Sequence, residues 1–142
     1  MNRKAIPLRG EEVIARLEAR VQNGSAEAAF ALAEAYQWGY LTEEDPARAE
    51  RLYRRLCRSK SPAVASRGFY RLGLLYYYGY RNKGESPEAG LSFAFACFMK
   101  SAIKFPNPPA LCRLGDMYRY GQYVEKNEAV ACELYLKARR GG

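Results

Sequence analysis

Histidine is absent from this 142-residue chain. Its absence removes Ser-His and Cys-His nucleophile pairs, imidazole metal ligands and the commonest general base. The one clear cluster of carboxylates, Glu43-Glu44-Asp45, has no partner that would position it as an acid/base pair and is best explained as a solvated loop ending in a helix cap. We therefore expect a protein that is not an enzyme and that holds no cofactor and no metal.

Cysteine is sparse and irregularly placed, at Cys57, Cys97, Cys112 and Cys132. No two cysteines form a CxxC pair, which argues against a structural zinc site. Their spacing is not periodic, as a disulfide framework in a repeating fold would be. We predict small apolar core residues in a reducing compartment.

Long hydrophobic runs are missing as well, and none approaches the roughly 20 apolar residues that a membrane span needs. Residues 1–10 are basic but have no apolar stretch behind them, so they do not form a secretory signal. These two absences predict a cytoplasmic protein without membrane insertion.

A short phrase occurs three times, about forty residues apart, at Leu32–Gly39, Leu72–Gly79 and Leu114–Gly121. Each copy has a small residue after the leucine, a tyrosine four positions after it and a glycine three positions after the tyrosine. Self-similarity at this period is typical of stacked helical hairpins, which form binding surfaces far more often than catalytic clefts.

Turn chemistry and apolar periodicity together predict seven helices. We expect them over residues 11–22, 26–38, 46–58, 62–78, 87–104, 109–120 and 128–139. A cap residue precedes every helix except the first. In four cases proline follows the cap, at Asp45-Pro46, Ser61-Pro62, Ser86-Pro87 and Asn107-Pro108, and in two cases the cap stands alone, at Ser25 and Asn127.

The second helix of each hairpin carries an apolar stripe that should face the core. In the first copy the stripe is Ala49, Leu52, Tyr53, Leu56 and Cys57, and in the third it is Ala131, Leu134, Tyr135 and Ala138. In the second copy we assign it to Gly90, Phe93, Ala94 and Cys97.

These residues resemble the Sel-one-like repeat (SLR) family, relatives of the tetratricopeptide repeats, whose phrase runs Ala-x-x-x-Leu-Gly-x-x-Tyr-x-x-Gly. Ala28, Leu32, Tyr36 and Gly39 match it in the first copy, and Ala110, Leu114, Gly115, Tyr118 and Gly121 in the third. The resemblance implies an all-α, right-handed α/α superhelix of about three hairpins behind an N-terminal capping helix. It predicts one domain over 1–142, divided into 10–24, 25–60, 61–106 and 107–142.

The resemblance also implies an adaptor in protein complexes, without an activity of its own, as in bacterial signalling, secretion and antagonism. By analogy with tetratricopeptide arrays, free first-helix positions line a concave groove that binds a partner protein or peptide. They are Phe30, Glu34, Gln37, Trp38, Tyr70, Leu74, Tyr77, Tyr78, Asp116, Arg119 and Tyr120. Trp38, Tyr78 and Tyr120 recur at one position and suit a binding hot spot, although packing against the next hairpin is an open alternative. Tyr36, Tyr76 and Tyr118 should belong to the core.

The net charge of +8 is concentrated between residues 48 and 71. Its centre is a basic seam, Arg48, Arg51, Arg54, Arg55, Arg58 and Lys60. The seam fits an acidic partner protein, a nucleic acid or simply a solvated face. The main hypothesis is therefore a protein-binding module, either an adaptor or a dedicated inhibitor of the immunity-protein type. The alternative is a nucleic-acid-associated factor that uses the seam. The last helix should have a polar outer face or form a homodimer.

Overall fold

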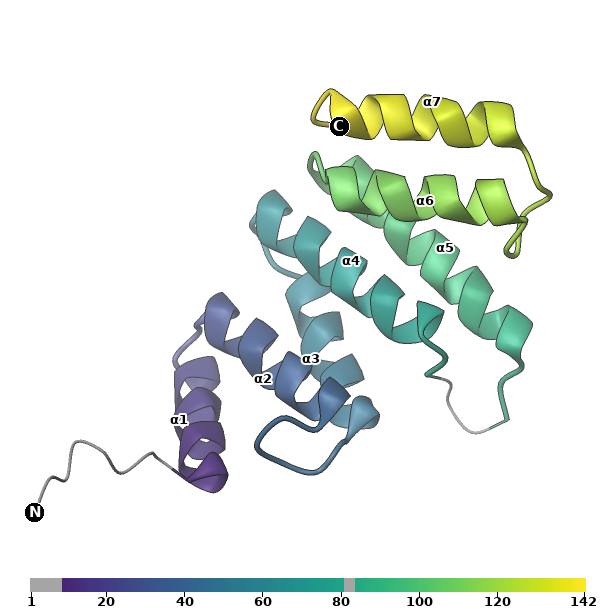
Figure 1. Cartoon of the computed structure of the whole chain (residues 1–142). Coiled ribbons are helices and arrows are strands. Elements are labelled where there is room, and N and C mark those ends of the chain that lie inside the picture. The colour runs from purple at the N-terminus through teal and green to yellow at the C-terminus, as the bar shows by residue number, and fades with distance from the viewer. Residues whose placement is uncertain (1–8, 81–83) are drawn as a thin grey trace, which may run out of the picture. The chain divides into compact units, whose positions relative to one another are not determined.

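The computed structural model describes residues 9–80 and 84–142. Over these ranges the chain forms seven helices and no strand (Figure 1). They are α1 (Gly10–Gln22), α2 (Ala26–Trp38), α3 (Pro46–Cys57), α4 (Pro62–Tyr77), α5 (Pro87–Lys104), α6 (Pro108–Tyr120) and α7 (Glu128–Arg139). No helix in the described part of the chain is long and apolar enough to cross a membrane. The expectation about a signal at the N-terminus falls largely outside the described residues.

The six predicted caps are confirmed in the structure. In each, a side-chain oxygen accepts a hydrogen bond from the backbone N–H three residues later, which satisfies one of the free donors of the first turn. At the other end, Gly39 and Gly121 take left-handed conformations, with φ of 71° and 65°, and stop α2 and α6.

Small differences from the predicted boundaries have local causes. Helix α1 begins one residue earlier than expected, at Gly10, because the Glu12 carboxylate accepts a hydrogen bond from the Arg9 backbone N–H at 3.4 Å. Helix α4 ends one residue earlier, at Tyr77, and the chain then turns at Gly79, whose φ of 101° favours glycine.

The residues divide into two compact units, one up to Tyr53 and the other from Arg54 to Gly142, so the boundary lies within α3. In the first unit, tyrosine hydroxyls join the helices. The hydroxyl of Tyr36 in α2 donates to Glu18 in α1 at 3.2 Å and accepts from Arg48 in α3 at 3.2 Å. The fully buried Tyr53 donates to Gln37 at 2.9 Å.

In the second unit, α5 lies along α4 and α7 lies along α6 (Figure 1). Helix α4 also approaches the end of α3 closely at Gly68. A Cβ atom placed there would lie 2.9 Å from the backbone of Leu56 and of Cys57. Only glycine fits such a crossing, so the sequence of α4 brings these two helices into direct backbone contact.

One aromatic ring of the second helix packs against the glycine of the phrase in each hairpin of this unit. A Cβ atom at Gly73 would lie 2.7 Å from the Phe98 ring, and one at Gly115 would lie 2.6 Å from the Tyr135 ring. In the predicted stripe of the second copy, Gly90, Ala94 and Cys97 are buried, and the prediction is wrong for Phe93. Phe98 is fully buried at the place that Tyr135 takes in the third copy, whereas Phe93 is 43% exposed.

The cysteines divide into two pairs, and all four are free. Cys97 is buried and Cys57 half-buried, and burial raises the pKa of their thiols to about 11 and about 12. Cys112 and Cys132 are exposed, so the prediction that the cysteines are core residues is wrong for these two. Their positions on α6 and α7 are outside the apolar stripes.

A candidate protein-interaction surface

The recurring aromatic position has exposed side chains in all three copies. Trp38 is 47% exposed, Tyr78 54% and Tyr120 62%. Two residues earlier, the phrase tyrosines Tyr36 and Tyr76 are buried, as predicted for core residues, and Tyr118 is half-buried. The position of Tyr36 and Tyr76 faces the second helix of its own hairpin and is buried, whereas the position of Trp38 and Tyr78 faces away from that helix and is exposed.

Three predicted groove residues are buried instead: Phe30, Gln37 and Leu74. The Gln37 amide oxygen accepts the hydrogen bond from the buried Tyr53 hydroxyl, so its role is to satisfy a polar group inside the first unit. Little of the surface of these three side chains is accessible to a partner protein. Glu34 is half-buried.

In the second unit, Arg113 of α6 joins the aromatic residues at the end of α4. Its guanidinium lies 5.7 Å from the centre of the Tyr77 ring and 5.9 Å from that of Tyr78, and it donates to the Tyr78 hydroxyl at 3.2 Å. Burial acts to lower the pKa of Arg113, but proximity to Tyr70 and Tyr78 outweighs it and raises this pKa. The Tyr77 hydroxyl donates to Gln122 at 2.9 Å. These contacts hold large, partly polar rings rigidly at the surface, which is the composition of binding hot spots.

The C-terminal part of α6 continues this surface with Arg119 and Tyr120. The Arg119 guanidinium lies 5.3 Å from the centre of the exposed Tyr120 ring. Asp116, in contrast, accepts the Tyr135 hydroxyl at 2.6 Å. Burial and this hydrogen bond raise the pKa of Tyr135 to about 12, although Arg119 acts in the opposite direction. Asp116 therefore joins α6 to α7 and contributes less to the surface than predicted.

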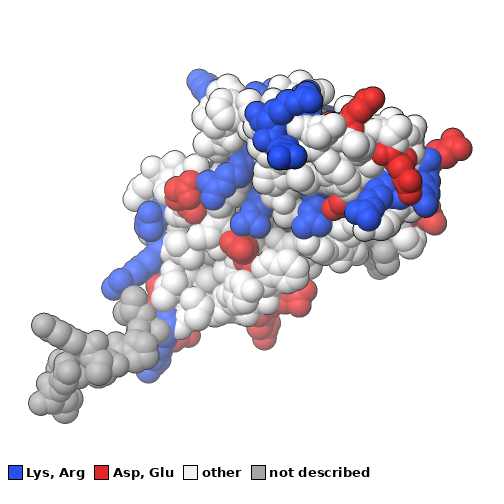
Figure 2. Space-filling model, turned by 45° about the horizontal axis from the view of Figure 1, so that its top comes forward, with Lys and Arg blue, Asp and Glu red and all other residues white. Residues whose placement is uncertain are grey.

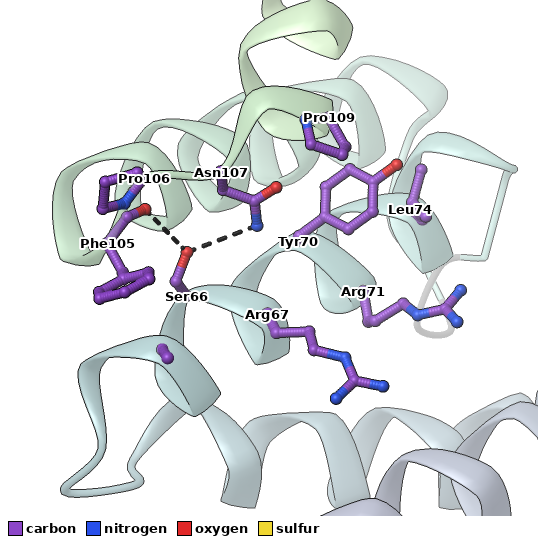
Figure 3. A pocket seen from close by; sticks show the side chains of 10 residues that line it. Ser66, Arg67, Tyr70, Arg71, Leu74, Phe105, Pro106, Asn107 and Pro109 are labelled. Atoms are coloured by element: carbon purple, nitrogen blue, oxygen red, sulfur yellow. Dashed lines mark hydrogen bonds between the residues drawn. The ribbon is translucent and has the colours of Figure 1, made fainter. Parts of the chain in front are cut away.

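A pocket of about 520 Å³ opens beside Tyr70, between α4 and the connection from α5 to α6 (Figure 3). One wall is formed by α4, and Arg67 and Arg71 extend from it side by side. The other wall is formed by the connection from α5 to α6 and is mainly apolar, with the Phe105 ring and two prolines beside Asn107. The complete lining is Ala63, Ser66, Arg67, Tyr70, Arg71, Leu74, Phe105, Pro106, Asn107 and Pro109.

A buried polar network holds the two walls together. The Ser66 hydroxyl is within hydrogen-bond distance of the Ser101 and Phe105 carbonyl oxygens, at 2.7 and 3.2 Å, and the Ser101 hydroxyl donates to the Ser66 carbonyl at 2.7 Å. The Asn107 amide donates to the Ser66 hydroxyl at 3.4 Å (Figure 3) and to the Ser101 hydroxyl at 2.9 Å. Because each group has a partner, the network orders the pocket without leaving a buried polar atom unsatisfied among the described side chains.

Sequence reasoning missed the residues that complete this surface, although a signal was present. Arg71 and Arg113 both stand one position before the leucine of the phrase, a register that we did not consider for the groove. Ser101 stands four residues after Cys97, where the apolar stripe of α5 would place an apolar residue. A serine in such a register indicates a buried polar partner, but not which one.

The basic seam is exposed along its length but is not a row of uniformly available charges. Arg48 binds Tyr36 and Asp45, the latter at 3.3 Å, and Arg54 donates to the Tyr76 hydroxyl at 2.7 Å. Figure 2 shows basic and acidic side chains interspersed on the face drawn. The seam therefore contributes in part to the fold.

A family model decides how these hairpins are classified. The Sel1 repeat matches at residues 26–61, 70–102 and 108–142, which cover most of the chain. The chain belongs to the Sel1 repeat family. The fold is accordingly that of the all-α repeat solenoids, as the resemblance implied, and Sel1 repeats are generally protein–protein interaction modules.

Two solved structures are similar to this Sel1 repeat chain. One is c5321, described as a protective antigen of uropathogenic Escherichia coli strains with an SLR fold, with a TM-score of 0.69 and 26% identity. The other is a Sel1 repeat protein from Oxalobacter formigenes, with a TM-score of 0.62 and 26% identity. Each match covers 91% of this chain, but only 26% of c5321 against 90% of the Oxalobacter protein. No curated protein matches the chain.

Proposed function

We propose that this Sel1 repeat chain is a non-enzymatic module that binds a partner protein on the first-helix surface of its second unit. The observation that supports this most directly is the cluster of Arg113 with Tyr70, Tyr77 and Tyr78, which presents ordered rings and a guanidinium to solvent. Exposed Tyr120 and Arg119 extend it along α6. Such residues bury large areas at little conformational cost, so this surface suits a partner protein.

The function takes one of two forms, an adaptor or a dedicated inhibitor of the immunity type, and the exposed surface of the second unit suits both. An acidic partner agrees with the net charge of +8, which would speed association. Free cysteines agree with a reducing, cytoplasmic setting. The exposed face of α7 carries Glu133 and Lys137, which favours the polar alternative over a homodimer, although Leu136 is 42% exposed there.

Nucleic-acid binding through the basic seam is the weaker alternative. Arg48 and Arg54 hydrogen-bond to tyrosines of the core, so fewer guanidinium groups remain to contact phosphates. The aromatic residue that stands within the seam, Tyr53, is fully buried and therefore cannot stack on a base of a single strand.

The test is capture of a partner from lysate of the source cells, with and without nuclease. The Tyr78→Ala/Tyr120→Ala variant should lose a nuclease-resistant protein by about tenfold or more, as expected for hot-spot residues. Tyr40→Ala is the matched control, since Tyr40 is 58% exposed but lies in the first unit, outside this surface. Equal capture by all three proteins would contradict the proposed surface. Recovery of nucleic acid that depends on Arg51 and Arg55 would instead support the alternative.

A further inference from the structure

The pocket beside Tyr70 has two chemically different walls, which restrict what it accommodates. Arg67 and Arg71 stand one turn apart on α4 and extend in the same direction (Figure 3). Elsewhere in the lining, Phe105 is 48% exposed and the Pro106 and Pro109 rings provide rigid apolar surface. A ligand that fits both walls has a carboxylate on one side and a bulky apolar group on the other.

From this we infer that the pocket binds an acidic segment of a partner protein, in which a carboxylate lies next to an aromatic or bulky apolar side chain. The inference rests on the proposed protein-binding function and names the chemistry of the partner. The carboxylate lies between Arg67 and Arg71, and the apolar side chain packs on Phe105 and Pro109. Arg67 and Arg71 have other interactions, but a guanidinium has five N–H donors and can bind a carboxylate in addition.

The volume and the rigidity of the pocket agree with a peptide ligand. About 520 Å³ holds one or two side chains with their backbone, within the range of ligand sites in proteins. The Ser66–Ser101–Asn107 network fixes the wall that carries Phe105, so little ordering is required on binding. Tyr70 lines the pocket and also lies close to Arg113, so the pocket continues into the aromatic surface described above.

A single-stranded nucleic acid fits the pocket less well. Binding along a strand needs basic groups spaced at successive phosphates, together with aromatic faces for the bases. Here the two arginines stand one turn apart on α4, so they offer one basic position rather than a row of them, and Pro106 and Pro109 flank the exposed Phe105 ring instead of further aromatic faces.

The experiment is selection of a random peptide library, displayed on phage, against the full-length protein. Enriched peptides should carry Asp or Glu beside Phe, Trp, Tyr or Leu. The best peptide is then synthesised, and its Kd is measured by fluorescence anisotropy. The Arg67→Gln/Arg71→Gln variant should bind it about tenfold to a hundredfold more weakly, the range that loss of charge-assisted hydrogen bonds gives.

Arg55→Gln/Arg58→Gln is the matched control, because it removes the same charge from exposed positions of the same unit and should change the Kd less than about twofold. Phe105→Ala tests the apolar wall and should weaken binding without changing the charge. Circular dichroism checks that each variant keeps its helices.

The inference is wrong if no peptide is enriched, if the enriched peptides lack acidic residues, or if both arginine pairs have equal effects. It is equally wrong if mixed-sequence single-stranded RNA, rather than an acidic peptide, depends on Arg67 and Arg71. These results are separate from the capture experiment, which changes Tyr78 and Tyr120. If the Tyr78→Ala/Tyr120→Ala variant loses the captured partner but no acidic peptide depends on Arg67 and Arg71, the proposed function is supported and the role of the pocket is wrong.

Discussion

The two hairpins of the second unit share one contact, which we call the joint: an aromatic ring of the second helix packs against the glycine of the phrase. The two joints differ in how deeply the ring is buried and in whether it makes a hydrogen bond. In α4–α5 the joint is dry: Phe98 is fully buried against Gly73 and has no polar atom to satisfy. In α6–α7 the equivalent ring is Tyr135, which is half-buried against Gly115 and bonds Asp116 at 2.6 Å. One repeat phrase thus supports a closed apolar joint or a partly solvated polar one, and only the second involves a first-helix carboxylate.

Removing each of the two rings should give the largest difference in stability between the two joints. Phe98→Ala leaves a cavity in a closed core and should lower the free energy of unfolding by about 3–5 kcal/mol. Tyr135→Ala should cost about 1–3 kcal/mol, because the half-buried site is open to water and can relax. Urea unfolding followed by circular dichroism measures both. Equal losses would show that the α6–α7 joint is as closed as the other.

Adding one methyl group at each glycine should separate the joints by a smaller amount. Gly73→Ala pushes against a ring that cannot move and should destabilise by about 1–2 kcal/mol after the gain in helix propensity. Gly115→Ala pushes against a ring with room to shift, and its cost should fall within about 0.5 kcal/mol of zero. The same unfolding measurement applies, and a larger cost at Gly115 would reverse our ranking of the two sites.

Removing only the hydroxyl of Tyr135 should have a smaller effect than removing the whole ring. Its folded-state pKa of about 12 lies above the unfolded value of 10, so its contribution to stability is complete below pH 10 and is lost as the pH rises toward 12. Tyr135→Phe should lower stability by about 1 kcal/mol at neutral pH and should flatten this part of the pH profile. Ultraviolet titration should lose one phenolate transition near pH 12. An unchanged titration curve would mean that another tyrosine titrates there.

The predicted elements follow from local chemistry, and this is why all seven helices lie within one residue of their expected ends. Caps such as Ser61 and Asn107 act within the next turn, and a glycine such as Gly121 stops a helix by its own conformation. It was also predictable that Tyr78 and Tyr120 lie on equivalent faces, since one register of a repeated helix recurs on one face, whereas their exposure was left open.

Other residues of the surface required knowledge of neighbours distant in sequence. Gln37 looked free by its register, yet it lies against the buried Tyr53 hydroxyl. Phe98 and Phe93 are both apolar residues of one helix, and only the contact with Gly73 decides which of them is buried. Periodicity gives the angle of a side chain around its helix, but it does not give the element that lies opposite.

By itself, the amino-acid sequence determined that this protein is a set of Sel1 repeat hairpins, which bonds begin and end its helices, and which chemistries the absence of histidine removes. The tertiary structure decided which tyrosines are exposed, which arginines bind tyrosines of the core, and that α4 and the α5–α6 connection enclose a pocket with a basic and an apolar wall. The physical reason is the separation along the chain between the residues that interact. Caps and turns act over a few residues of chain, whereas Ser66, Ser101 and Asn107 meet only after the helices have packed.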